Sequence, residues 1–146
     1  MIYPRKLFWL GLPLSAAVAM ASPNESSLAA SLDGNWDVVV ACSAEPNGGK
    51  AFTLRYKAEI RNSVIQGQHG TKDQPGSQSI AGPINPDGTA QLTVNGLVGN
   101  PEAAFKQRRE NHYYNYQVNA RFEGDKGSGS RQKDRACTFT FSRRSK

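Results

Sequence analysis

The chain has 146 residues, of which 38% are hydrophobic and 21% charged, and its formal net charge is +6. This length and composition allow one globular domain with a core of its own. The two histidines stand without clustered carboxylates, which is not the donor set of a zinc site. No catalytic or nucleotide motif stands out either, so we expect neither a cofactor nor an enzymatic activity.

Residues 1–21 have the three parts of a secretory signal peptide. Arg5 and Lys6 form a basic start, 7–18 is an apolar run, and 19–21 (Ala-Met-Ala) supplies the small residues that a signal peptidase reads. The apolar run is shorter than the ~20 residues that a membrane-spanning helix needs. We therefore predict cleavage of this segment, no stable membrane insertion afterwards, and a periplasmic or extracellular product.

Charge is distributed unevenly over the rest of the chain. We expect 22–31, which is small and polar, to be a disordered linker, and 32–146 to be a single domain. Residues 22–103 carry five Lys or Arg against eight Asp or Glu, whereas 104–146 carry eleven against four. The basic second half suits an anionic component of the cell envelope or, as we favour, a solvated surface. Nucleic acid is not an expected partner, because no aromatic-basic motif accompanies the charge.

Alternation of apolar and polar residues predicts a chain made of strands. In 52–60 and 114–122 the alternation gives each segment one buried and one wet face. The expected strands are 32–42, 52–60, 63–69, 78–84, 90–95, 114–122, 127–132 and 137–141. Tight turns such as 85–88 (Asn-Pro-Asp-Gly) join several of them, which favours an antiparallel meander.

A sheet of eight short strands with one apolar face must shield that face from water. Closing the sheet into a barrel covers it and also removes the edges of the sheet. The sequence therefore predicts an all-β fold, an eight-stranded antiparallel up-and-down barrel, with a two-sheet sandwich as the alternative. A barrel of eight strands is wide enough either to be filled by its own side chains or to hold one small ligand.

The two cysteines predict how the barrel closes. An even cysteine count in an exported chain favours a disulfide, and here Cys42 ends the first strand while Cys137 begins the last one. If these strands pair antiparallel with the cysteines opposite each other, inward residues meet inward residues along the whole ladder. The further pairs are then Val40 with Phe139, Val38 with Phe141, and Trp36 with Arg143.

A second pattern joins Trp36 with two arginines near the end of the chain. Gly34-Asn35-Trp36 at the start of the first strand, with Arg143 or Arg144 near the end of the last one, resembles the G-x-W and arginine pair of lipocalins and other calycins. In that superfamily the arginine stacks on the tryptophan across the closed end of the barrel, which is a stabilising geometry. The resemblance implies a calycin-like barrel in which Arg143 is the first candidate to stack on Trp36.

A wider resemblance covers nearly all of 32–142. It rests on the strings D-G-N-W…C, I-Q-G-Q-H-G-T…Q-P-G, P-D-G-T-A, N-G-L-V-G-N-P, Y-N-Y-Q-V-N-A-R-F-E-G and R-A-C-T-F. Together these strings resemble a family of small secreted domains from alphaproteobacteria, some of which are fused to caspase-like peptidase or signalling modules. The resemblance implies a bacterial accessory domain that folds on its own, and it supplies no catalytic residues.

The segment 97–112 is longer than a hairpin needs. Within it, 102–110 has a composition that allows one short helical turn. Long loops in compact domains are either functional or disordered. Because Phe105 is the one obvious apolar anchor, we favour a disordered or surface segment, with a lid over one end of the barrel as the alternative.

Inward-facing aromatic residues carry the functional prediction. Most such residues fill a core, but in a cavity tyrosine hydroxyls supply the few polar anchors of an apolar ligand pocket. Tyr56, Tyr114 and Tyr116 are the candidate ligand-binding residues. The sequence thus predicts a non-enzymatic barrel that binds a small apolar ligand or an envelope component. A protein-interaction or protease-inhibitor-like module is the alternative, and an enzyme acting through His69 and Asp73 ranks below both.

Overall fold

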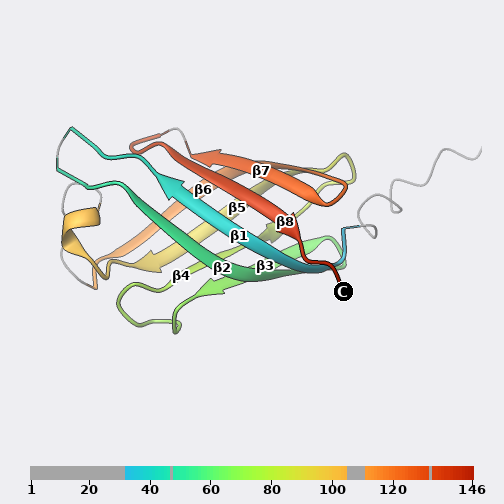
Figure 1. The fold of residues 1–146 in the computed structure, drawn as a ribbon, viewed down its shortest axis with the longest axis horizontal. Helices are drawn as coiled ribbons and strands as arrows, with labels where there is room; N and C mark the ends of the chain where they lie inside the picture. The colour runs from blue at the N-terminus through green and yellow to red at the C-terminus, as the bar shows by residue number, and fades with distance from the viewer. Residues whose placement is uncertain (1–31, 47, 105–110, 132) are drawn as a thin grey trace, which may run out of the picture.

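The computed structural model describes residues 32–46, 48–104, 111–131 and 133–146, so the predicted signal peptide and linker over 1–31 lie outside the described residues. Eight antiparallel strands form a closed barrel in sequence order, with β8 paired to β1 (Figure 1). The elements are β1 (Gly34–Cys42), β2 (Phe52–Arg61), β3 (Val64–His69), β4 (Gln78–Pro83), β5 (Thr89–Leu97), the 3-10 helix η1 (Pro101–Ala103), β6 (Tyr113–Glu123), β7 (Lys126–Arg131) and β8 (Cys137–Arg143). The predicted barrel is confirmed, and the two-sheet sandwich is excluded.

The seam between β1 and β8 has the predicted register. Cys42 lies opposite Cys137 with their Cα atoms 4.1 Å apart, and a disulfide joins the two side chains. The pairs Val40–Phe139, Val38–Phe141 and Trp36–Arg143 follow along the ladder. Because the bond links residues 95 positions apart, loop-closure entropy makes it worth about 4–5 kcal/mol. The disulfide indicates an oxidising compartment, and no helix in the described ranges is long and apolar enough to cross a membrane.

Trp36 fills one end of the barrel. Its side chain is fully buried, and its indole Nε1 donates a hydrogen bond to the carbonyl of Leu32 at 2.9 Å. The guanidinium of Arg143 lies over the indole at 5.2 Å from the ring centre. Phe122 packs edge-on against the same ring, with the two centroids 5.6 Å apart. Of the two candidate arginines, Arg143 is therefore the one that stacks on Trp36.

Strand β7 leaves room for this aromatic core. Its first two inward positions are glycines, and a Cβ placed on Gly127 would lie 2.7 Å from the ring of Phe122. A Cβ on Gly129 would lie 2.9 Å from the side chain of Val118. The glycine-rich sequence of β7 thus marks a strand that its neighbours approach closely.

The inward side chains are buried at the Trp36 end of the barrel and only half-buried at the opposite end. In β2 the last three inward residues are buried, whereas Phe52 and Leu54 are only half-buried. In β6 the last three inward residues are also buried, whereas Tyr114 and Tyr116 are half-buried. The end of the barrel that holds Trp36 is therefore filled by side chains, and the opposite end is not.

Candidate ligand-binding cavity

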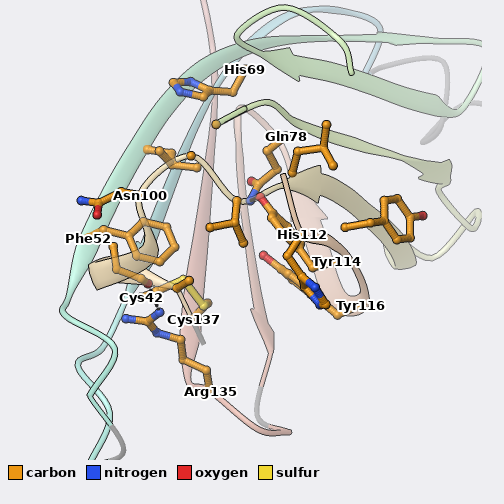
Figure 2. A pocket seen from close by; sticks show the side chains of 18 of the residues that line it. Cys42, Phe52, His69, Gln78, Asn100, His112, Tyr114, Tyr116, Arg135 and Cys137 are labelled. Carbon is orange, nitrogen blue, oxygen red and sulfur yellow. Dashed lines mark hydrogen bonds between the residues drawn. A yellow bond between two sulfur atoms is a disulfide. The ribbon is translucent and has the colours of Figure 1, made fainter. Parts of the chain in front are cut away.

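A cavity of about 610 Å³ occupies the half-filled end of the barrel. All eight strands contribute lining residues near one of their ends, and the segment that follows β5 adds to the wall. Figure 2 shows Phe52 and the disulfide across this cavity from Tyr114 and Tyr116. Ligand-binding pockets in proteins typically have volumes of about 300–1,000 Å³. The cavity is therefore of a size that one small molecule can occupy.

One wall of the cavity is apolar. Phe52 and Leu54 of β2 line it, together with the disulfide between Cys42 and Cys137. Val98, which follows β5, adds an apolar side chain to the same cavity. These groups offer no strong hydrogen-bonding partner, so this wall suits the hydrocarbon part of a ligand.

The facing wall carries a chain of hydrogen bonds centred on a buried amide. The hydroxyl of Tyr56 donates to Oε1 of Gln78 at 3.2 Å, and Nε2 of Gln78 donates to the hydroxyl of Tyr114 at 3.1 Å. Gln78 is only 1% exposed. A buried amide needs such partners, because leaving it unpaired would cost about 1–3 kcal/mol. The chain therefore fixes the position of the Tyr114 hydroxyl.

Arg131 and Tyr116 form a second polar group on the wall. The guanidinium of Arg131 lies over the Tyr116 ring at 4.0 Å from its centre. Nη2 of Arg131 lies 3.5 Å from a carboxylate oxygen of Asp134. The rings of Tyr114 and Tyr116 lie nearly parallel, with centroids 6.1 Å apart. The wall thus presents two phenol hydroxyls with a guanidinium beside them.

The three tyrosines predicted to bind a ligand occupy different positions. Tyr114 and Tyr116 line the cavity, whereas Tyr56 does not and instead reaches it through Gln78. Their role in binding stays a prediction. Gln78 was missed from the sequence, although a signal was present. It begins a strand in which Gln78 and Ile80 share the inward face, so the period of two alone places this amide inside the barrel.

Gly96 shapes the tyrosine wall from β5. It lies opposite Tyr114 in the β5–β6 ladder, and a Cβ at this position would come within 2.3 Å of the Tyr114 ring. The absence of a side chain at Gly96 lets this ring lie across the neighbouring strand. A glycine in a strand commonly marks such a close approach.

Arg135 holds the rim of the cavity together. It is 3% exposed, its Nε donates to the carbonyl of Ser43 at 2.8 Å, and its Nη1 donates to the carbonyl of Ala103 at 2.5 Å. Its Nη2 donates to the carbonyl of Lys50. The guanidinium also lies 4.8 Å from the centre of the Phe52 ring. Desolvation lowers the pKa of this guanidinium from its ordinary value. One buried cation therefore joins the β1–β2 loop, η1 and the apolar wall.

The described part of the predicted loop 97–112 lies against the barrel. The amide of Lys50 donates to the carbonyl of Glu102 at 2.8 Å, and the two side chains form an ion pair at the same distance. At the other side, the amide of Gly76 donates to the carbonyl of Leu97 at 2.9 Å. Figure 1 shows η1 beside the β1–β2 loop at this end of the barrel.

Residues 99–102 are exposed, as expected of a surface segment, and backbone hydrogen bonds hold 97–104 at the cavity. The described helical turn, Pro101–Ala103, overlaps the start of the predicted 102–110, and 105–110 lie outside the described residues. Its amide donor at Glu102 is capped by the side chain of Asn100 at 3.0 Å. Phe105, the predicted anchor, lies outside the described residues.

Of the pair His69 and Asp73 considered from the sequence, the described lining of the cavity includes His69. His69 lines the cavity, with its ring centre 6.0 Å from that of Tyr56, and His112 lines it as well. Asp73 is not among the described residues that line the cavity. Within the described part of the chain, no group of three or more His, Cys, Asp or Glu side chains is placed to hold a metal ion.

Comparison of the chain with protein-family models, with curated proteins and with solved structures finds no match in any of the three. The comparisons thus identify the chain with no family. What the structure shows is the closed eight-stranded antiparallel barrel and the stacked pair of Trp36 with Arg143.

Proposed function

We propose that this domain is a non-enzymatic binding protein that holds one small, largely apolar ligand in the cavity opposite Trp36. The observation that carries the proposal is the cavity itself, about 610 Å³ in volume, with an apolar wall facing a few fixed polar groups. This division of the lining is the usual composition of a small-molecule site. The apolar part supplies affinity, and the polar groups orient the ligand.

The half-buried state of the lining supports this proposal. An eight-stranded barrel can be filled by its own side chains, and the Trp36 half of this one is. Phe52, Leu54 and the two wall tyrosines remain partly exposed to the cavity. Covering apolar surface stabilises by about 25 cal/mol per Å², so a ligand that fills the space gains from these surfaces.

We further propose that the domain acts in the periplasm or outside the cell. The Cys42–Cys137 disulfide fits an oxidising compartment. The predicted signal peptide over 1–21 supports export, and so does the resemblance to secreted alphaproteobacterial domains. A ligand met there would come from the medium or from the cell envelope.

A docking role for the barrel surface has less support. Among the described residues, the exposed large hydrophobic side chains are Val64, at 39%, and Tyr113, at 59%. They lie on β3 and β6, and the hydroxyl of Tyr113 is bonded to Asn95 at 2.5 Å. Two separate side chains are a small apolar surface for a protein partner. We therefore do not propose a protease-inhibitor-like module.

The proposal is tested by native mass spectrometry of the protein purified from the periplasm. The variant Leu54→Trp adds bulk inside the cavity, whereas Thr53→Trp adds the same bulk on the outer face of β2. We expect a co-purified mass on the wild type and on Thr53→Trp, and its loss from Leu54→Trp. In a titration with the neutral probe N-phenyl-1-naphthylamine, we expect the wild type and Thr53→Trp to bind the probe and Leu54→Trp to bind it more weakly.

Two results would contradict the proposal. One is a wild-type protein that carries no added mass and binds no probe. The other is equal probe binding by Leu54→Trp and the wild type, since binding would then lie outside the cavity. Circular dichroism of both variants establishes that each retains the barrel.

A further inference from the structure

We infer that the polar end of the ligand is a carboxylate, held by the hydroxyls of Tyr114 and Tyr116 beside the guanidinium of Arg131. This inference rests on the proposed function and adds the chemical class of the ligand. It follows from the direction of the hydrogen bonds on the polar wall and from the charges at the cavity.

The direction of the hydrogen bonds leaves donors facing the cavity. The Tyr114 hydroxyl already accepts a hydrogen bond from Nε2 of Gln78 at 3.1 Å, and the guanidinium of Arg131 lies over the ring that carries the Tyr116 hydroxyl. A phenol oxygen that accepts a bond still carries its own proton to donate. Because both rings line the cavity, these two protons are available to a ligand acceptor.

Tyr56, in the packed half of the barrel, sets the direction of these hydrogen bonds. Its hydroxyl donates to Oε1 of Gln78, which turns the amide nitrogen toward Tyr114. Burial of Gln78 at 1% exposure leaves this amide to be satisfied by protein groups. The polarity of the wall is thus built into the packed half of the barrel.

The two wall phenols also stay protonated at neutral pH. Desolvation raises the pKa of the Tyr114 and Tyr116 hydroxyls above their ordinary values. Neither oxygen therefore becomes a phenolate, which would accept hydrogen bonds and repel an anion. The wall keeps its donors over the whole physiological range.

The charged side chains at the cavity favour an anion. Among the described residues that line it, the charged side chains are those of Arg131, Arg135 and Asp134, besides the two histidines. Asp134 is paired with Arg131 at 3.5 Å and is half exposed, so it lies toward solvent. A carboxylate has two acceptor oxygens and no donor, and guanidinium and hydroxyl donors match it.

A ligand with an ammonium group does not fit the same wall. An ammonium has donors only, so at this wall it would face two hydroxyl protons and a guanidinium, and the carboxylate nearest to them is the exposed Asp134. An uncharged alcohol is intermediate, because it can accept one hydrogen bond but lacks the charge. Three ligands with one hydrocarbon chain and different ends therefore separate the possibilities.

The test is calorimetric titration of the wild-type protein with decanoate, 1-decanol and decylamine at neutral pH and one ionic strength. We expect decanoate to bind about tenfold more tightly than 1-decanol, from the added strength of charge-assisted hydrogen bonds, and decylamine to bind most weakly. Equal affinity for the acid and the alcohol would overturn the carboxylate inference while leaving the proposed function intact. Binding of none of the three would contradict both.

Three variants then locate the carboxylate. Tyr116→Phe and Arg131→Gln each remove a group of the polar wall, whereas Tyr113→Phe removes a hydroxyl on the neighbouring exposed side chain. We expect the first two to lose most of the preference for decanoate over 1-decanol, and Tyr113→Phe to keep it. The ratio of the two affinities is the readout, so a general loss of stability does not imitate the result. A ratio unchanged in Tyr116→Phe and in Arg131→Gln would place the carboxylate elsewhere and overturn the inference.

Discussion

The hydroxyl of Tyr56 donates to Oε1 of Gln78 at 3.2 Å where the packed half of the barrel meets the cavity, and both side chains are buried. Each group supplies a hydrogen-bond partner that the other needs when it is buried. Removing one of them leaves a buried polar atom of the other without its partner, whereas removing both leaves neither atom of this pair. Stability should therefore depend on the pair and not on either residue alone.

A double-mutant cycle measures this dependence. We expect Gln78→Met to lower the free energy of unfolding by about 1–3 kcal/mol, because the Tyr56 hydroxyl loses its acceptor. Adding Tyr56→Phe should then cost less than it does in the wild type, so the two losses are not additive. Urea unfolding of the four proteins gives the coupling energy. Additive losses would show that the bond does not couple the two sites.

Arg143 and Arg144 provide a matched pair at the filled end of the barrel. Arg143 lies over the Trp36 ring and donates to the carbonyl of Asp33 at 3.0 Å. Arg144 lies 3.6 Å from Asp37 on the exposed surface. We expect Arg143→Ala to lower the free energy of unfolding by about 1–3 kcal/mol and Arg144→Ala to change it by less than about 0.5 kcal/mol. Equal losses in thermal unfolding would count against the stacked pair as the closure of this end.

Arg135 should control how firmly the segment after β5 stays on the barrel. We expect Arg135→Leu to raise the hydrogen-exchange rate of the Lys50 amide, which donates to Glu102, by about tenfold or more, because local opening becomes easier. Lys50→Met removes only the exposed ion pair with Glu102 and should leave that exchange rate nearly unchanged. Unaltered exchange in Arg135→Leu would show that other contacts hold this segment.

Alkaline pH should destabilise the domain through Tyr56. Desolvation, with smaller contributions from Tyr116 and Tyr114, raises the pKa of the Tyr56 hydroxyl well above its ordinary value. The unfolded chain loses this proton near pH 10, about the pKa of a free tyrosine, while the folded chain keeps it. The folded state then binds more protons, so the free energy of unfolding falls as pH rises above that value.

This pH dependence is measured by urea unfolding between pH 8 and 11. The matched variant is Tyr56→Phe, which lacks the buried hydroxyl and should show a shallower fall over the same range. Identical slopes for the two proteins would show that Tyr56 ionises alike in the folded and unfolded states.

The closure of the barrel was predictable from the sequence, and the cavity was not. In β1 and β8 the period of two, the two cysteines and the apolar pairs between them all agree on one register, because a slip by one residue would turn every side chain to the wrong face. The volume of the cavity is not given by any comparable sequence pattern. It depends on how Phe52, Leu54 and the wall tyrosines divide the space between them, which only the assembled barrel determines.

The cavity residues themselves show the same limit. The inward position of Gln78 could be predicted from the sequence, because alternation along β4 places it on the inward face. The position of Arg135 could not, because its three hydrogen bonds go to backbone carbonyls of Ser43, Lys50 and Ala103, and a carbonyl carries no sequence signal. The direction of the Tyr56–Gln78–Tyr114 chain likewise depends on three strands that meet only in the fold.

Nuclear magnetic resonance of the 15N-labelled protein during titration with N-phenyl-1-naphthylamine shows whether a small ligand occupies the cavity opposite Trp36. The side-chain amide of Gln78 and the indole Nε1–H of Trp36 report on the two ends of the barrel. We expect large chemical-shift changes for the Gln78 side-chain amide and for the first residues of β6, with the Trp36 indole signal unchanged. Shifts confined to the outer face, or a saturating titration that leaves the Gln78 amide unmoved, would contradict binding in the cavity.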